Sequence, residues 1–249
     1  RNGEGSHLLF NGHTDTVSAA GMTIDPFNGE IRDDRLWGRG ATDMKGPLAG
    51  MLASLLCLRE RDDWHGALTV SCVVDEEYKY RGILSLLEAN APWDFAVVGE
   101  PTSLHVVRGC KGSCRFTIHT EGRSAHSSEP GKGANAIVGM ARAIPAMAEF
   151  FETDLAQFTR EGFGQSTGSI GLIDGGSGIN IVPERCTISI DIRTIPEQDW
   201  HATLACLEEY VRAWCGDLDE VQLIFDEPSH FSPSFETLAD HPLVQAACE

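Results

Sequence analysis

Short apolar runs that alternate with helical patterns constrain the fold of this chain more than any other feature. Three such runs lie around residues 8–10, at 68–74 (LTVSCVV) and at 95–98 (FAVV). They are typical of strands buried in a parallel sheet. Residues 43–68 and 82–90 lie between these runs and repeat leucine at helical spacing. The order strand, helix, strand, helix, strand predicts a doubly wound α/β domain with a mostly parallel sheet and flanking helices.

The pattern changes after about residue 103. Residues 114–120 and the second half of 181–193 alternate apolar and polar side chains, which predicts strands with one buried and one solvated face. Two further strands are expected at 169–173 and 221–226, and two helices at 133–151 and 198–214. The resulting order, β-α-β-β-α-β, predicts a ferredoxin-like α+β module.

The domain organisation follows from these two patterns. We expect an α/β domain over residues 1–103, an inserted module over 104–226, and a return into the first domain over 227–249. The return begins with a predicted linker, EPSHFSPSF, and continues as a helix from residue 236.

Composition limits the partners and the location. With 37 acidic and 19 basic residues the net charge is −18, so nucleic acid is not an expected partner. No apolar stretch is long enough to span a bilayer and no signal-peptide pattern opens the chain, so no membrane association is expected. Eight cysteines without a CxxC pair suit reduced thiols, which predicts a cytoplasmic protein.

Side chains that can bind metals follow each predicted strand of the parallel sheet. They are His13 and Asp15 after the first strand, Asp75, Glu76 and Glu77 after the second, Glu100 after the third, and Asp43 before the connecting helix. In open parallel sheets ligands bind beyond the carboxyl ends of the strands, so these groups are expected to meet at one edge. Imidazole with several carboxylates is a ligand set for zinc, cobalt or manganese.

Each of these features has an ordinary alternative when taken alone. A histidine and an aspartate two residues apart at a strand end are more often a surface turn, and the acids at 75–77 would suit a solvated strand end. Glu100, before a proline, would suit a loop. The coincidence of all of them at one sheet edge favours a metal site.

A series of motifs in the chain resembles the successive signatures of one enzyme family. They are GHTDTV, DPFNG, LWGRGATDMKGPLAG, VVDEEY, VVGEPT, GRSAHSSEPGKGANAI and GINIVPERCTISIDIRTIP. The chain resembles the co-catalytic zinc amidohydrolases and metallopeptidases, a family that includes aminoacylase, acetylornithine deacetylase, succinyl-diaminopimelate desuccinylase and glutamate carboxypeptidase. The resemblance implies a catalytic α/β domain that binds two zinc ions per full-length subunit, with cobalt or manganese as substitutes. It also implies that the inserted module is a lid through which two subunits form a homodimer.

The resemblance assigns roles to the residues at the sheet edge. His13 and Glu100 would bind one metal ion, Glu77 the other, and Asp43 would bridge both. Asp15 would orient His13, and Glu76 would be the general base that takes a proton from water. Relatives hold the peptide bond after the bridging aspartate in the cis form, so Asp43–Met44 is the expected cis bond.

Three lid residues match positions that act on the substrate in the family. His126 would reach the active site of the partner subunit and stabilise the developing oxyanion. Asn180 and Arg193 would bind substrate, the guanidinium being suited to a carboxylate. From the residues alone, a loop histidine and a solvated arginine are the alternatives.

One family feature is missing. The second metal site is completed in the family by a histidine late in the resumed catalytic domain, and none of His201, His230 and His241 fits that position. Because the chain also begins at Arg1 rather than Met, we expect an internal segment of a longer enzyme. This segment is expected to be inactive on its own, with its second metal site weak or empty.

The predicted activity is hydrolysis of the amide of a small N-acyl amino acid, of the deacetylase or desuccinylase type, by a metal-activated water. One alternative is a carboxypeptidase or dipeptidase of the same family that acts on a small peptide. Another is a non-catalytic dimerising scaffold, or an inactive fragment of the enzyme.

Overall fold

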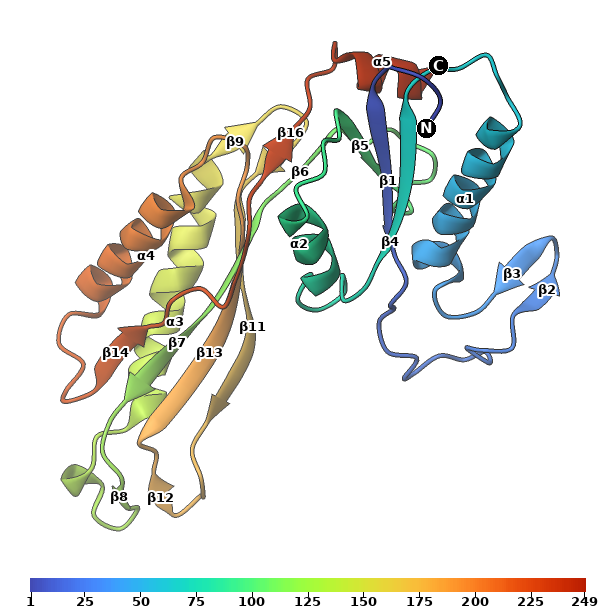
Figure 1. The fold of residues 1–249 in the computed structure, drawn as a ribbon. Coiled ribbons are helices and arrows are strands. Elements are labelled where there is room, and N and C mark those ends of the chain that lie inside the picture. Colours follow the sequence, from blue (N-terminus) through green and yellow to red (C-terminus); the bar gives the residue numbers. More distant parts are fainter. The chain divides into compact units, whose positions relative to one another are not determined.

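The computed structural model describes residues 1–249, which form two compact units (Figure 1). Unit 1 comprises residues 1–106 and 246–249, and unit 2 comprises residues 107–245. The first boundary lies close to the predicted one at residue 103.

Unit 1 contains a parallel sheet of three strands in the order β4-β1-β5. Its main elements are β1 (His7–His13), α1 (Gly46–Arg59), β4 (Ala67–Val73), α2 (Arg81–Glu88) and β5 (Phe95–Val98). A hairpin of β2 (Glu30–Arg32) and β3 (Arg35–Trp37) and a short π-helix, η1 (Ala41–Lys45), precede α1. The two crossovers from β1 to β4 and from β4 to β5 run in opposite directions along the sheet, and α1 and α2 lie on opposite sides of it (Figure 1). The predicted doubly wound arrangement is confirmed.

The core of unit 1 lies between α1 and the sheet. Met44, Leu48 and Met51 are buried there against Phe10 and Val70. The helix predicted between residues 43 and 68 is α1, which begins at Gly46 and ends at Arg59, and a loop leads from it to β4.

Unit 2 is built on an antiparallel sheet in the order β11-β13-β7-β14. Its main elements are β7 (Ser113–Glu121), α3 (Ala136–Glu152), β11 (Thr167–Gly175), β13 (Arg185–Arg193), α4 (Trp200–Cys215) and β14 (Gln222–Phe225). Along the chain this is the predicted β-α-β-β-α-β order, and the ferredoxin-like module is confirmed.

The alternation in the strands of unit 2 separates two faces. Phe116 and Ile118 of β7 and Ile188, Ile190 and Ile192 of β13 are at most 2% exposed. They pack against the buried side chains of α3 and α4, while the intervening polar residues lie on the other face and, except for the buried Ser113 and His119, are at least partly exposed. One face is therefore dry and the other wet, as the period of two predicts.

Unit 2 also contains short strands and 3-10 helices outside this main sheet and its two helices. They are β6 (Gly109–Cys110), β8 (Ala125–His126), η2 (Pro130–Lys132), η3 (Leu155–Gln157), β9 (Thr159–Arg160), β10 (Gly164–Gln165) and β12 (Ile181–Val182). The strand predicted over 181–193 is broken into β12 and β13, with Pro183 between them. Proline lacks a backbone N–H, so it interrupts a ladder. β12 pairs instead with β8.

The predicted return to unit 1 at residue 227 is wrong for most of that segment. The predicted linker contains β15 (His230–Ser232), which pairs with β7, and β16 (Phe235–Glu236), which pairs with β6. Backbone hydrogen bonds tie the segment to unit 2 as far as Thr237, and unit 2 extends to residue 245. The final helix, α5 (Pro242–Cys248), also starts later than the predicted residue 236.

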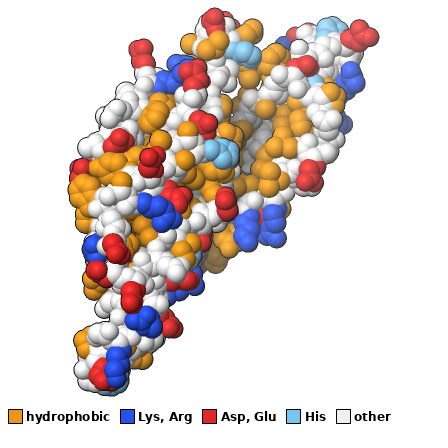
Figure 2. Space-filling view, turned by 90° about the vertical axis from the view of Figure 1, so that its left-hand side faces the viewer, with side chains coloured by type: hydrophobic (Ala, Val, Ile, Leu, Met, Phe, Trp, Pro, Cys, Tyr) orange, Lys and Arg blue, Asp and Glu red, His pale blue; other side chains and the backbone are white.

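The surface carries mixed charge. On the face of the molecule seen in Figure 2, Lys and Arg side chains are interspersed with Asp and Glu, and apolar side chains are exposed between them. None of the helices is both long enough and apolar enough to traverse a lipid bilayer.

Candidate functional site

His13 ends β1 and is the most enclosed residue of the site, with 1% of its surface exposed. Its Nδ1 lies 2.9 Å from the backbone carbonyl oxygen of Asp15, a group that can only accept a hydrogen bond. Nδ1 therefore carries a proton, and this contact turns Nε2 toward the carboxylates around it.

The role predicted for Asp15 differs in detail. Its carboxylate lies 3.6 Å from Nδ1 of His13, so the backbone carbonyl, not the carboxylate, orients the ring. The carboxylate accepts hydrogen bonds from the backbone N–H groups of Glu76, at 3.2 Å, and Glu77, at 3.1 Å. Asp15 thus connects the end of β1 to the turn after β4.

That turn explains how two adjacent glutamates serve one site. β4 ends at Val73, so the alternation of side chains stops before Glu76 and Glu77. Asp75 is different: its carboxylate forms an ion pair with Arg81 at 2.8 Å. This third acid therefore belongs to a structural ion pair and not to the metal-binding cluster.

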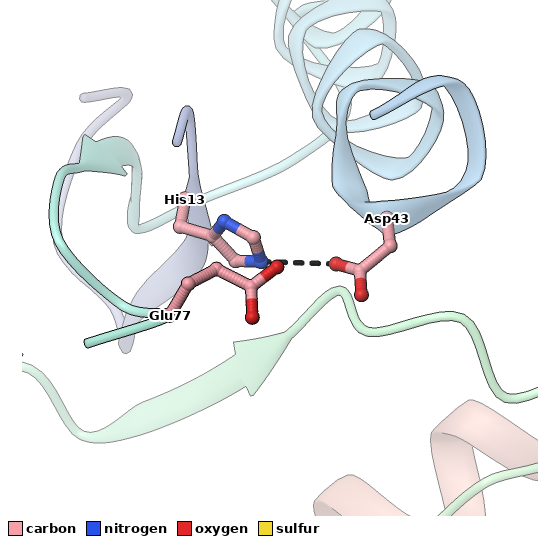
Figure 3. A group of neighbouring side chains, drawn as sticks. All are labelled: His13, Asp43 and Glu77. Atoms are coloured by element: carbon pink, nitrogen blue, oxygen red, sulfur yellow. Dashed lines mark hydrogen bonds and ion pairs between the residues drawn. The ribbon is translucent and has the colours of Figure 1, made fainter. Parts of the chain in front are cut away.

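The carboxylates converge on Nε2 of His13. The nearest oxygens belong to Asp43 at 3.0 Å, Glu100 at 3.8 Å and Glu76 at 4.0 Å. Figure 3 shows the carboxylates of Asp43 and Glu77 reaching the imidazole from separate segments of the chain. Two groups of potential ligand atoms, His13 with Asp43 and Glu77 and His13 with Glu76 and Glu100, each lie within 4.8 Å of one another. The predicted convergence of His13, Asp43 and Glu100 is therefore present.

Asp43 lies in η1, directly before α1. The Asp43–Met44 peptide bond is cis, as expected from the resemblance. Gly40 precedes this segment with a φ of 79°, a conformation that glycine adopts without steric cost.

The charges of the site perturb its acid–base groups. Burial lowers the pKa of His13, but the Asp15 carbonyl and the carboxylates of Glu100 and Glu76 outweigh it and raise the pKa above 6.5. Burial, assisted by neighbouring carboxylates, raises the pKa of Glu76 and of Glu100. Burial opposes ionisation of Asp15, yet the N–H groups of Glu77 and Glu76 lower its pKa. The cluster thus has an excess of negative charge that a cation would balance.

These residues fit a divalent metal ion. One imidazole lone pair and several carboxylate oxygens lie within a few ångströms of a common point. This donor set is the one that zinc and similar ions prefer. The Asp43 and Glu100 side chains are 52% and 40% exposed, so an ion has access from solvent.

The predicted lid residues fall into two places within unit 2. His126 lies on β8, with Nδ1 2.7 Å from the hydroxyl of Ser128, and the carbonyl of Asn180 accepts the N–H of Ser127 at 3.0 Å. Arg193 ends β13 and donates to Asp191 at 2.8 Å. Because β13 starts near β12 and runs nine residues, Arg193 lies on the order of 25 Å from His126 and Asn180.

The three late histidines do not belong to unit 1. His201 is on α4, His230 is on β15, and His241 directly precedes α5. All three lie within residues 107–245, whereas every predicted metal ligand lies within residues 1–106.

One contact of the site was not foreseen from the sequence. The sulfur of Met44 accepts the backbone N–H of His13 at 3.1 Å. The only sequence signal was the position of this apolar residue beside Asp43, in a polar stretch before the helix.

The sequence and the fold of this chain are similar to those of known proteins. Residues 108–217 match the sequence family described as "Peptidase dimerisation domain". The chain is 33% identical over 255 residues to the acetylornithine deacetylase of Vibrio vulnificus, covering 97% of this chain and 65% of the relative. It is 36% identical over 248 residues to the acetylornithine deacetylase of Erwinia tasmaniensis, covering 96% and 63%.

Solved structures share the fold. A tripeptidase from Staphylococcus aureus superposes with a TM-score of 0.76 at 23% identity, covering 99% of this chain and 64% of the tripeptidase. An M20 family metallo-carboxypeptidase from Sulfolobus solfataricus gives 0.66 at 18% identity, covering 97% and 68%. This chain spans about 65% of the length of the Vibrio vulnificus deacetylase. The gene product that contains this chain is called the whole protein.

Proposed function

Because this chain belongs to the M20 family of metallopeptidases and amidohydrolases, we propose that the whole protein is a metal-dependent amidohydrolase that deacylates N-acyl amino acids. The observation that carries the proposal is the convergence of His13, Asp43, Glu76, Glu77 and Glu100 at the carboxyl edge of the parallel sheet. The substrate class follows the deacetylase relatives, which share a third of their aligned residues with this chain. The solved peptidases, below 25% identity, support only the fold.

We assign the metal to zinc, two ions per subunit of the whole protein. His13 and Glu100 would hold one ion, Glu77 the other, and Asp43 would bridge them. When bound, such ions acidify water and polarise an amide carbonyl. The hydrogen bond to the Asp15 carbonyl fixes the proton on Nδ1 of His13 and keeps Nε2 aimed at the site.

Glu76 is the proposed general base. Its carboxylate lies 4.0 Å from Nε2 of His13 and is 36% exposed, so it borders both the cluster and solvent. Burial raises its pKa, which strengthens it as a base for the attacking water and as a later proton donor to the leaving amine. The hydrogen bonds from Glu76 and Glu77 to Asp15 restrict the turn that carries it.

The lid residues are proposed to complete the site. Arg193 would bind the substrate carboxylate, in exchange for part of its contact with Asp191. His126 and Asn180 would come from the partner subunit. Their separation from Arg193, on the order of 25 Å within one chain, exceeds the size of an acyl amino acid and supports this division.

A substrate panel tests the activity. The whole protein, loaded with zinc or cobalt, is assayed for amine release from N-acetyl and N-succinyl amino acids, including N-acetylornithine, and from dipeptides. We expect an N-acyl amino acid to be hydrolysed with a kcat/KM at least about tenfold above any dipeptide. The same protein stripped of metal, and reloaded, is the control.

Two results would contradict the proposal. Cleavage of dipeptides with no deacylation would place the protein among the peptidases of the family. Bound metal without hydrolysis of any compound would favour a non-catalytic dimerising scaffold, although the intact set of Asp43, Glu76, Glu77 and Glu100 argues against it. The predicted cytoplasmic location is not tested by this assay and stays a prediction.

Mixing two inactive variants tests the homodimer and the trans role of His126. Glu76→Gln and His126→Ala chains are each expected to be nearly inactive in the whole protein. After subunit exchange, half of the dimers are mixed and carry one intact site each, so activity returns to about one quarter of wild type. If activity does not recover in dimers that native mass spectrometry, with one chain tagged, shows to be mixed, His126 acts within its own subunit. A wild-type protein that is monomeric and fully active would exclude the dimer itself.

A further inference from the structure

The backbone N–H of His13 lies beyond the last residue of β1 that pairs with β5. β5 pairs with β1 only as far as Val98 opposite Asn11, and the last bond on that side runs from the Gly99 N–H to the Asn11 carbonyl at 3.1 Å. His13, two residues further along β1, points its N–H to the same side of the strand. A buried N–H without an acceptor is destabilising, so the site requires an acceptor from elsewhere.

Met44 supplies that acceptor. Its Sδ lies 3.1 Å from the His13 nitrogen, and the residue is completely buried. Two glycines leave the space for it: a Cβ on Gly12 would lie 2.5 Å from the Met44 Cε, and one on Gly99 would lie 3.2 Å from it. The flexible thioether of Met44 thus fills a gap between the ends of β1 and β5, and a side chain at Gly12 or Gly99 would occupy that gap.

The same segment also contacts the other end of His13. Asp43, directly before Met44, has Oδ1 3.0 Å from Nε2 of the imidazole. Two consecutive residues therefore hold His13 at its backbone nitrogen and at its ring nitrogen. A shift of Met44 would move the histidine and the carboxylate relative to each other.

We propose that Met44 is a positioning residue for the metal site, through the hydrogen bond between its sulfur and the His13 N–H. This inference rests on the proposed function, since it assigns Met44 the task of fixing His13 and Asp43 in the geometry that binds metal. Residues behind metal ligands typically change affinity by about 10–100-fold when they are replaced.

Met44→Leu tests the proposal, with Met51→Leu as its matched control. Both substitutions replace a thioether by an isobutyl group in the same buried cluster, but only Met44 binds a backbone N–H through its sulfur. We expect Met44→Leu to weaken Co²⁺ binding by the 249-residue chain about tenfold and to speed hydrogen exchange of the His13 amide. Met51→Leu should leave both within about twofold of wild type.

The outcomes separate this inference from the proposed function. Failure of the wild-type chain to bind Co²⁺ would count against the proposed function. If the wild-type chain binds Co²⁺, and Met44→Leu and Met51→Leu bind it with the same affinity as each other, the proposed role of Met44 is overturned and the proposed function is not. Should Met44→Leu fail to fold, norleucine incorporation replaces each of the five methionine sulfurs by a methylene with little change of shape. Norleucine protein with unchanged Co²⁺ affinity and His13 exchange would also overturn the proposal.

Discussion

Replacing Glu76 with glutamine is expected to lower kcat of the whole protein by about 10²–10⁴-fold, the usual effect of removing a general base. The amide keeps the size of the side chain but cannot accept the proton of the attacking water. Metal affinity should stay close to wild type, because His13, Asp43, Glu77 and Glu100 supply the proposed ligands. Steady-state kinetics on the metal-loaded variant, with its metal content measured in parallel, gives the result.

Glu60→Gln is a suitable control for this change. Glu60 is a glutamate of unit 1 whose side chain is 78% exposed and pairs only with Arg59, so its replacement should not affect turnover. Turnover of Glu76→Gln within a few fold of wild type would exclude Glu76 from proton transfer.

Asp43→Asn is expected to abolish tight metal binding by the chain. Asp43 is the carboxylate closest to Nε2 of His13 and the proposed bridging ligand, so the loss should exceed the 10–100-fold typical of an outer-shell residue. Zinc titration of the metal-stripped 249-residue chain should show at most one tight site in the wild type and none in the variant. The whole protein should show two.

Asp25→Asn is the control for Asp43→Asn. Asp25→Asn makes the same change at an exposed aspartate that accepts the N–H of Phe27, and it should leave zinc binding unchanged. Two equally tight sites in the wild-type 249-residue chain would mean that a residue other than a late histidine completes the second site beside Glu77. The assignment of Glu77 would then need revision.

The strands and helices that could be predicted from the sequence are those with a clear pattern of apolar residues along a short stretch of chain. The alternation in β7 and β13 reports which face is buried, because a period of two sends successive side chains to opposite faces. The strands of the parallel sheet leave an equally clear signal as short apolar runs, and the helices between them repeat apolar residues at helical spacing. The segment from 227 to 245 leaves no such signal, because β15 and β16 are only three and two residues long. Their pairing with β7 and β6 depends on partners more than a hundred residues away in the chain.

The candidate site likewise has features that the sequence predicts and features that depend on the tertiary structure. The sequence alone determined which groups gather at the sheet edge, because the carboxyl ends of parallel strands carry His13, Glu76, Glu77 and Glu100 to one place whatever the details of packing. It did not determine how those groups are held. The carboxylate of Asp15 bonds the turn of Glu76 instead of the His13 ring, and only the path of the chain after β4 decides this.

The tertiary structure alone also decided the contact of Met44 with His13. That contact exists because β5 stops opposite Asn11 and leaves the next N–H of β1 on that side without a ladder partner. The relative lengths of two strands that are distant in the sequence set this vacancy. A hydrogen bond between residues 31 positions apart therefore leaves no local pattern in the sequence, whereas the strands that create the need for it appear there as apolar runs.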